Sequence, residues 1–80
     1  MDSSEFFNTV KQRTDQIEVR VIQSLTTNNK VLAFQSKIQL MEIMREIAQQ
    51  GWTSRDLLLL QTRIMKLDTK LTEGIATFLF

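Results

Sequence analysis

The sequence predicts an all-α fold of three helices. Two short polar or glycine-containing clusters, at 26–29 and 50–54, interrupt apolar residues that otherwise recur at steps of three and four. The 80 residues contain no Pro and only two Gly, so few other positions would break a helix. We therefore expect helices near 4–25, 30–50 and 54–78. They would form one small domain, 1–80, as a bundle or a helical hairpin completed by partner subunits.

The first predicted helix carries most of its apolar residues on one face, namely Phe6, Val10, Ile17, Val21 and Leu25. Its middle, 17–22, also alternates like a strand and is rich in β-branched residues. A single strand would have no partner strand elsewhere in the sequence. We therefore expect a helix here.

The second predicted helix follows the four polar residues at 26–29, which favour a turn or a cap. Its apolar stripe consists of Val31, Phe34, Ile38, Met41, Met44 or Arg45, and Ala48. Three further residues, Leu40, Ile43 and Ile47, broaden that stripe. A face this wide is able to contact two neighbours at once.

The third predicted helix has the clearest pattern. Gly51 can end the preceding helix, Thr53 or Ser54 can cap this one, and Asp56 suits its first turn. Seven residues at heptad spacing then form one apolar stripe, which we call the seam: Leu57, Leu60, Ile64, Leu67, Leu71, Gly74 and Phe78. Leu58, Leu59, Met65, Ile75, Leu79 and Phe80 add apolar surface beside it. Arg55, Arg63, Lys66 and Lys70 lie off the seam, where they can stay solvated.

Composition excludes several classes of function. The chain has no Cys and no His, which excludes disulfides, thiolate or imidazole metal sites, and nucleophiles of the Cys or Ser–His type. No cluster of carboxylates suggests a metal site or acid–base chemistry, so we expect no enzyme, no catalytic residues, no metal and no cofactor. The net charge of +1 argues against a nucleic-acid partner. The longest aliphatic run, 57–60, is far too short for a transmembrane segment.

Two interpretations of the seam stand side by side. It is either one face of a monomeric three-helix bundle or an interface with another chain. The supply of apolar surface favours the interface, because 80 residues can hardly hide the broad second helix, the flanking leucines and an apolar C-terminus. We therefore predict protein partners, in a homo-oligomer or a hetero-oligomer. The three methionines Met41, Met44 and Met65 indicate either an adaptable groove or ordinary core.

The segment 53–64 resembles small structural subunits of bacterial type III secretion systems, the inner-rod and needle subunits. In that family a turn precedes paired leucines, a Gln follows one turn later, and an amphipathic C-terminal helix completes the chain. The matching positions here are Asp56, Leu57, Leu58, Leu60, Gln61 and Ile64, with Leu71, Gly74 and Ala76 as later matches. The resemblance covers roughly 53–77, and the chain length and the lack of Cys also fit the family.

The resemblance implies a non-enzymatic bacterial subunit that assembles through its C-terminal helix, with Gly74 allowing close approach of helices. The N-terminus is acidic and polar, so we expect no cleavable signal peptide, and either export or a cytoplasmic location before assembly. A small cytosolic chaperone or adaptor of the same apparatus is the alternative. A helix-turn-helix DNA binder around 47–57, with Arg55, Gln61 and Arg63 near the groove, is the lesser one.

Overall fold

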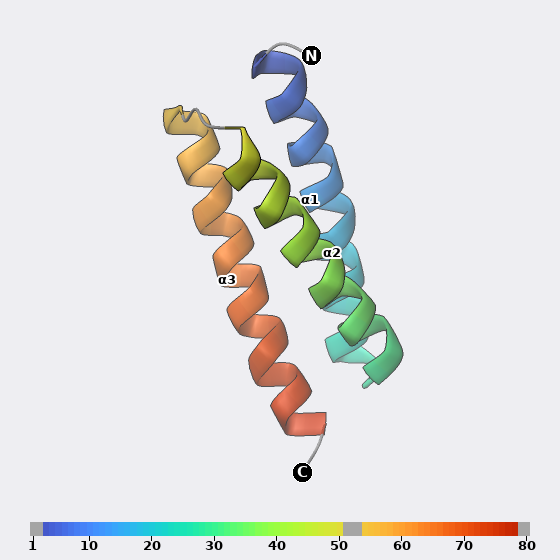
Figure 1. Ribbon diagram of the computed structural model, residues 1–80. Helices are drawn as coiled ribbons and strands as arrows, with labels where there is room; N and C mark the ends of the chain where they lie inside the picture. Colours follow the sequence, from blue (N-terminus) through green and yellow to red (C-terminus); the bar gives the residue numbers. More distant parts are fainter. Residues whose placement is uncertain (1–2, 51–53, 79–80) are drawn as a thin grey trace.

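The computed structural model describes residues 3–50 and 54–78, which form three helices lying side by side (Figure 1). Helix α1 spans Ser3–Thr26, α2 spans Lys30–Gln49 and α3 spans Arg55–Phe78. No strand occurs in these two stretches. The predicted all-α fold is therefore confirmed, and each helix begins and ends within one residue of its predicted bounds. The bundle is elongated, with extents of 43 × 17 × 16 Å.

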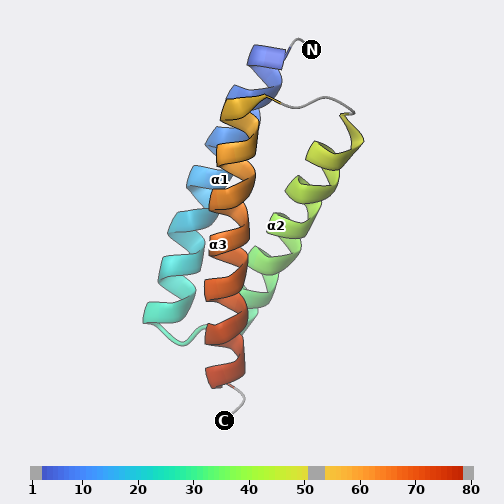
Figure 2. The same ribbon diagram turned by 90° about the vertical axis from the view of Figure 1, so that its left-hand side faces the viewer.

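The chain runs up and down, so α2 is antiparallel to both neighbours (Figures 1 and 2). The turn predicted at 26–29 is present. Asn28 adopts a left-handed backbone (φ 54°), and the amide of Asn29 donates to the carbonyl of Ser24 at 2.9 Å. The side chain of Asn29 then accepts from the amide of Leu32 at 3.0 Å, which caps α2.

Helix α3 is capped by Ser54, whose hydroxyl accepts from the amide of Leu57 at 3.1 Å. This selects Ser54 from the two predicted caps. The predicted C-cap Gly51 and the other candidate cap, Thr53, lie outside the described residues, as do Leu79 and Phe80.

The core runs along the bundle axis and takes residues from all three helices. Its buried apolar members are Val10, Ile17, Val21, Ala33, Leu40, Ile43, Ile47, Leu57, Leu60, Ile64, Leu67, Leu71 and Ile75. Phe6, Phe7, Leu25 and Phe78 are half-buried and pack against this set. The predicted apolar face of the first helix is thus confirmed as a core face.

Three polar side chains, Thr14, Ser24 and Ser36, are also fully buried. Each hydroxyl donates to a carbonyl of its own helix at 2.8 Å: Thr14 to Val10, Ser24 to Val21 and Ser36 to Leu32. Their hydrogen-bonding capacity is therefore satisfied without any bond between helices.

Candidate protein-interaction surface

The seam of α3 lies inside the chain's own bundle. Five of its residues, Leu57, Leu60, Ile64, Leu67 and Leu71, are buried, and Phe78 is half-buried against the core. Ile75, predicted to lie beside the seam, is buried as well. In this fold the seam packs on α1 and α2, as the monomeric bundle interpretation predicts. An interface with another chain made of these residues would require α3 to leave the bundle.

Gly74, the gap in the seam, allows a close approach within the chain. A Cβ atom at this position would lie 2.0 Å from Cδ2 of Leu25, near the end of α1. Real Cβ atoms do not come this close to another atom. The predicted close approach of helices at Gly74 therefore occurs between α3 and α1 of one molecule.

Helix α2 has two apolar faces, and the structure reverses their expected roles. The residues predicted only to broaden the stripe, Leu40, Ile43 and Ile47, are buried. They pack inward together with Ala33 and Ser36. The main predicted stripe instead faces solvent, and with Arg45 we call it the α2 ridge: Val31, Phe34, Ile38, Met41, Met44, Arg45 and Ala48.

The α2 ridge is well exposed. Its five large apolar side chains have exposed fractions between 38% for Met44 and 67% for Val31. The core residues of α2 are at 33, 36, 40, 43 and 47, whereas the ridge residues are at 31, 34, 38, 41, 45 and 48, with Met44 at the border between the two lines. Both sets follow heptad spacing, and at 100° per residue they point to roughly opposite sides of the helix. The ridge is therefore directed away from the core.

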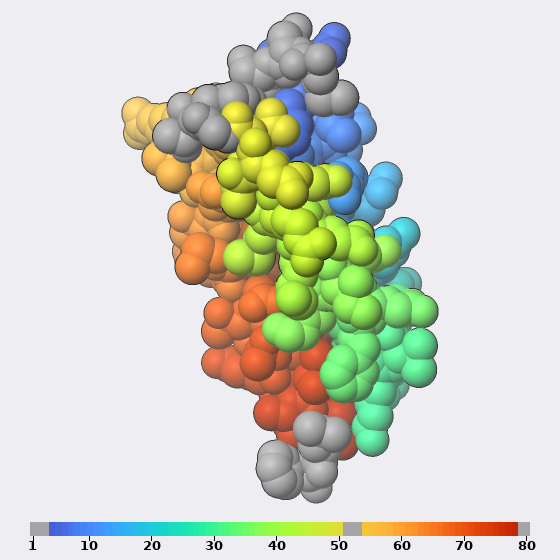
Figure 3. Space-filling model, viewed as in Figure 1, coloured from blue at the N-terminus to red at the C-terminus, as the bar shows by residue number. Residues whose placement is uncertain are grey.

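Two exposed residues of α3 extend this apolar surface. Lys37 Nζ of α2 lies 3.1 Å from Asp68 Oδ1 and 2.8 Å from the hydroxyl of Thr72, which fixes how the antiparallel helices align. In this alignment Met65 lies level with the middle of the ridge, and Leu58 lies level with its C-terminal end. Figure 3 shows this side of the molecule, with α2 in front and α3 beside it.

The methionines belong to this surface and not to the core. Met41, Met44 and Met65 are 53%, 38% and 59% exposed. Of their two predicted roles, ordinary core is wrong, and an exposed, adaptable surface is the one compatible with the structure.

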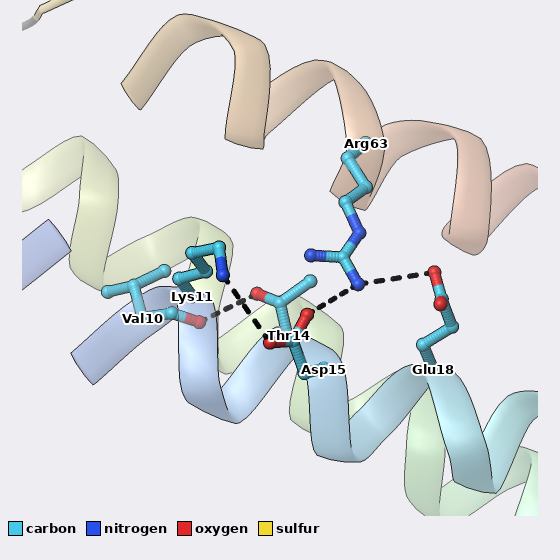
Figure 4. Close-up of polar contacts among 6 residues, drawn as sticks. All are labelled: Val10, Lys11, Thr14, Asp15, Glu18 and Arg63. Atoms are coloured by element: carbon cyan, nitrogen blue, oxygen red, sulfur yellow. Dashed lines mark hydrogen bonds and ion pairs between the residues drawn. The ribbon is translucent and has the colours of Figure 1, made fainter. Parts of the chain in front are cut away.

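The opposite groove, between α1 and α3, is crossed by charged contacts (Figure 4). Arg63, predicted to stay solvated, lies 2.7 Å from Asp15 and 3.3 Å from Glu18. Partial burial lowers the pKa of Arg63, but the hydrogen bond to Asp15 and the charge of Glu18 outweigh this, and the pKa is raised. Lys11 lies 3.8 Å from Asp15 as well.

This cluster weighs against the predicted DNA-binding role. Arg63, one of three residues offered for base contacts, already has two carboxylate partners on α1. In addition, α2 and α3 run antiparallel along the bundle (Figures 1 and 2), whereas the helices of a helix-turn-helix meet at about 90–120°. The arrangement is that of a bundle surface.

Other kinds of site are not found in the part of the chain that the structure describes. No group of three acidic side chains within 3–50 and 54–78 is placed to hold a metal ion. Over the same residues, no helix combines the length and the apolar character needed to cross a membrane. The sequence matches no protein-family model and no curated protein, and no solved structure matches the chain.

Proposed function

We propose that this chain is a non-enzymatic subunit that works by binding other protein chains through the α2 ridge. The observation that supports this proposal is the orientation of α2. One heptad line of its side chains is buried in the core, and a second line exposes Val31, Phe34, Ile38 and Met41. Four large apolar side chains exposed along one line of a helix form an unusually apolar surface for a small domain. A helix laid along them would remove them from water.

The setting that we propose is a type III protein secretion apparatus, on the resemblance of residues 53–77. Within it, the fold favours a chaperone or adaptor that keeps its bundle closed and holds a helix of a secretion subunit. The closed core favours this role because Leu57, Ile64 and Leu71 are fully buried without a partner.

The self-assembling structural subunit stays the second candidate. It is favoured by the heptad regularity of α3. In this role the bundle would open, and the seam would exchange its contacts with α1 and α2 for contacts with neighbouring subunits.

Mixing the full chain with purified needle and inner-rod subunits tests the proposal, with complex formation followed by size-exclusion chromatography and light scattering. We expect a discrete complex that Ile38→Asp abolishes and Ile22→Asp preserves. Ile22 is a matched control because it is 50% exposed, close to the 56% of Ile38, but lies on α1. Equal binding by both variants, or no binding at all, would contradict the proposal.

The two candidate roles differ in hydrogen exchange. An adaptor keeps the amides of α3 protected in the complex, because its core stays closed. A structural subunit instead assembles into rods or rings as its concentration rises. The amides of α3 should then lose protection first, because the seam must leave α1 before it can bind a neighbouring subunit.

A further inference from the structure

The spacing, charge and exposed area of the α2 ridge are compatible with pairing to an identical ridge. We propose that a second copy of this chain binds there, with the two α2 helices antiparallel across a two-fold axis. The inference rests on the proposed function, since both use the α2 ridge, and a secretion subunit that binds there would displace the second copy. The alternative occupant, a helix of a different protein, is an outcome of the test below.

The symmetry follows from spacing. The heptad positions 31, 34, 38, 41, 45 and 48 are arranged evenly about a midpoint between 39 and 40. An antiparallel pair centred there places Val31 opposite Ala48, Phe34 opposite Arg45 and Ile38 opposite Met41, each pair occurring twice. Such an isologous contact is closed, so it produces a dimer and no larger assembly.

The one charge on the ridge selects this orientation. Arg45 forms no ion pair with any residue that the structure describes. In the antiparallel pair its guanidinium meets the ring of Phe34 of the second copy, a cation–π contact that needs no carboxylate. In a parallel pair, Arg45 would lie beside Arg45 of the second copy and the like charges would repel.

The flanking positions are compatible with the same pairing. Gln35 and Glu42, which border the ridge, come opposite each other in the two copies, where the amide can donate to the carboxylate. Lys37, on the other border, keeps its partner Asp68 at 3.1 Å within its own chain. No two like charges are brought together in this arrangement.

The area available also suits a weak dimer. At 38% to 67% exposure, the five large apolar side chains leave roughly 500 Å² of apolar surface on each copy, against about 800 Å² per partner in a standard interface. Shifting the pair by one heptad would leave Arg45 and Ala48, or Val31 and Phe34, outside the overlap and reduce this area. The centred pairing is therefore the one that covers the whole ridge.

The first test is sedimentation equilibrium or light scattering of the full chain from about 10 µM to 1 mM, a range suited to an interface of this size. We expect the mass to rise from 9.4 kDa to twice that value and then stop. Ile38→Asp should weaken dimerisation at least tenfold, whereas Ile22→Asp should leave it unchanged. Both residues are at least half-exposed, so circular dichroism should show the same helix content in all three proteins.

The second test uses the absence of cysteine to fix the orientation. Val31→Cys and Ala48→Cys are made in separate chains, mixed and oxidised. Because a disulfide needs Cα atoms within about 7 Å, the antiparallel pair should yield cross-links between the two different variants and few within either one. Val19→Cys, exposed on α1, is the control and should stay uncross-linked.

Three results would overturn this inference: a constant mass of 9.4 kDa, growth beyond a dimer, or cross-links between identical variants. The proposed function is tested separately. If the chain stays monomeric but binds a needle or inner-rod subunit, and Ile38→Asp abolishes that binding, the dimer is refuted and the proposed function is supported. A monomer that binds none of them contradicts both.

Discussion

Leu25 of α1 fills the space that a side chain at Gly74 of α3 would need. Its Cδ2 atom is 2.0 Å from the position of an added Cβ, and its Cγ is 3.4 Å away. The contact joins the C-terminal end of α1 to the last turns of α3. Gly74 thus lies in the interior of α3 at the point where this helix meets α1.

A double-mutant cycle measures this contact. Gly74→Ala alone should change the free energy of unfolding by less than about 1 kcal/mol, because the Leu25 side chain must move aside and this cost offsets the gain in helix propensity. In a Leu25→Ala background the same change should raise it by about 1 kcal/mol, since only the propensity remains. Urea titrations of the four proteins give the cycle. The same effect in both backgrounds would show that Gly74 does not contact Leu25.

The seam should behave as a core. Leu71 is fully buried, so Leu71→Ala should cost about 2–5 kcal/mol and Leu71→Asp should unfold the chain at any concentration. Leu59→Ala is the control, because Leu59 is 61% exposed and should change stability by less than about 0.5 kcal/mol. Far-UV circular dichroism at low micromolar concentration separates the two. A folded Leu71→Asp chain that only fails to assemble would instead restore the seam as an intermolecular interface.

Asn28 should tolerate glycine better than alanine. Its backbone is left-handed (φ 54°), a conformation that alanine adopts at a cost of roughly 1–2 kcal/mol and glycine adopts freely. We expect Asn28→Ala to lower the melting temperature and Asn28→Gly to leave it within a degree or two. Thr27→Ala, one residue earlier in the same turn, is the control for loss of a polar side chain.

Stability should change little between pH 6 and pH 9. The chain has no His and no Cys, and Arg63 has a raised pKa. A group whose pKa is raised by folding stabilises the folded state fully below its unfolded pKa and loses this only as the pH rises through the folded value. For Arg63, whose pKa is raised by the charges of Asp15 and Glu18, that loss falls at a pH far above this range. Thermal melts across pH 6–9 check this, and a steep slope there would contradict the prediction.

The contact of Arg63 with α1 should nevertheless be weak and sensitive to salt. Its partners Asp15 and Glu18 are half or more than a third exposed, so solvent screens the pairs. Arg63→Met, which keeps most of the apolar stem, should lower stability by less than about 1 kcal/mol, and 1 M NaCl should remove most of the difference. A difference that persists in high salt would indicate packing instead of charge.

The helices and the seam could be predicted because they depend on local order along the chain. The steps of three and four from Leu57 to Leu71 fix one face of α3, and the polar residues at 26–29 mark where α1 ends. Asn29 and Ser54 cap the helices that follow.

The orientation of α2 could not be predicted in the same way, because two of its faces carry heptad spacing. The larger side chains, such as Phe34 and Met41, indicated the wrong one as the main core face. The buried face is instead marked by the small residues Ala33 and Ser36, which allow close packing of helices. The ion pairs of Arg63 could not be predicted from the sequence either, since Asp15 and Glu18 lie on another helix, more than forty residues away along the chain.

The three buried hydroxyls bear on how firmly the helices are registered. Because Thr14, Ser24 and Ser36 each bond to their own helix, no hydrogen bond in the described interior joins one helix to another. Axial alignment is therefore set by side-chain shape and by rim contacts such as Lys37 with Asp68. A shift of α3 by one helical turn along its neighbours would therefore break no hydrogen bond inside the bundle. What opposes such a shift is the set of ion pairs at the edge of the bundle and the close fit of Leu25 against Gly74.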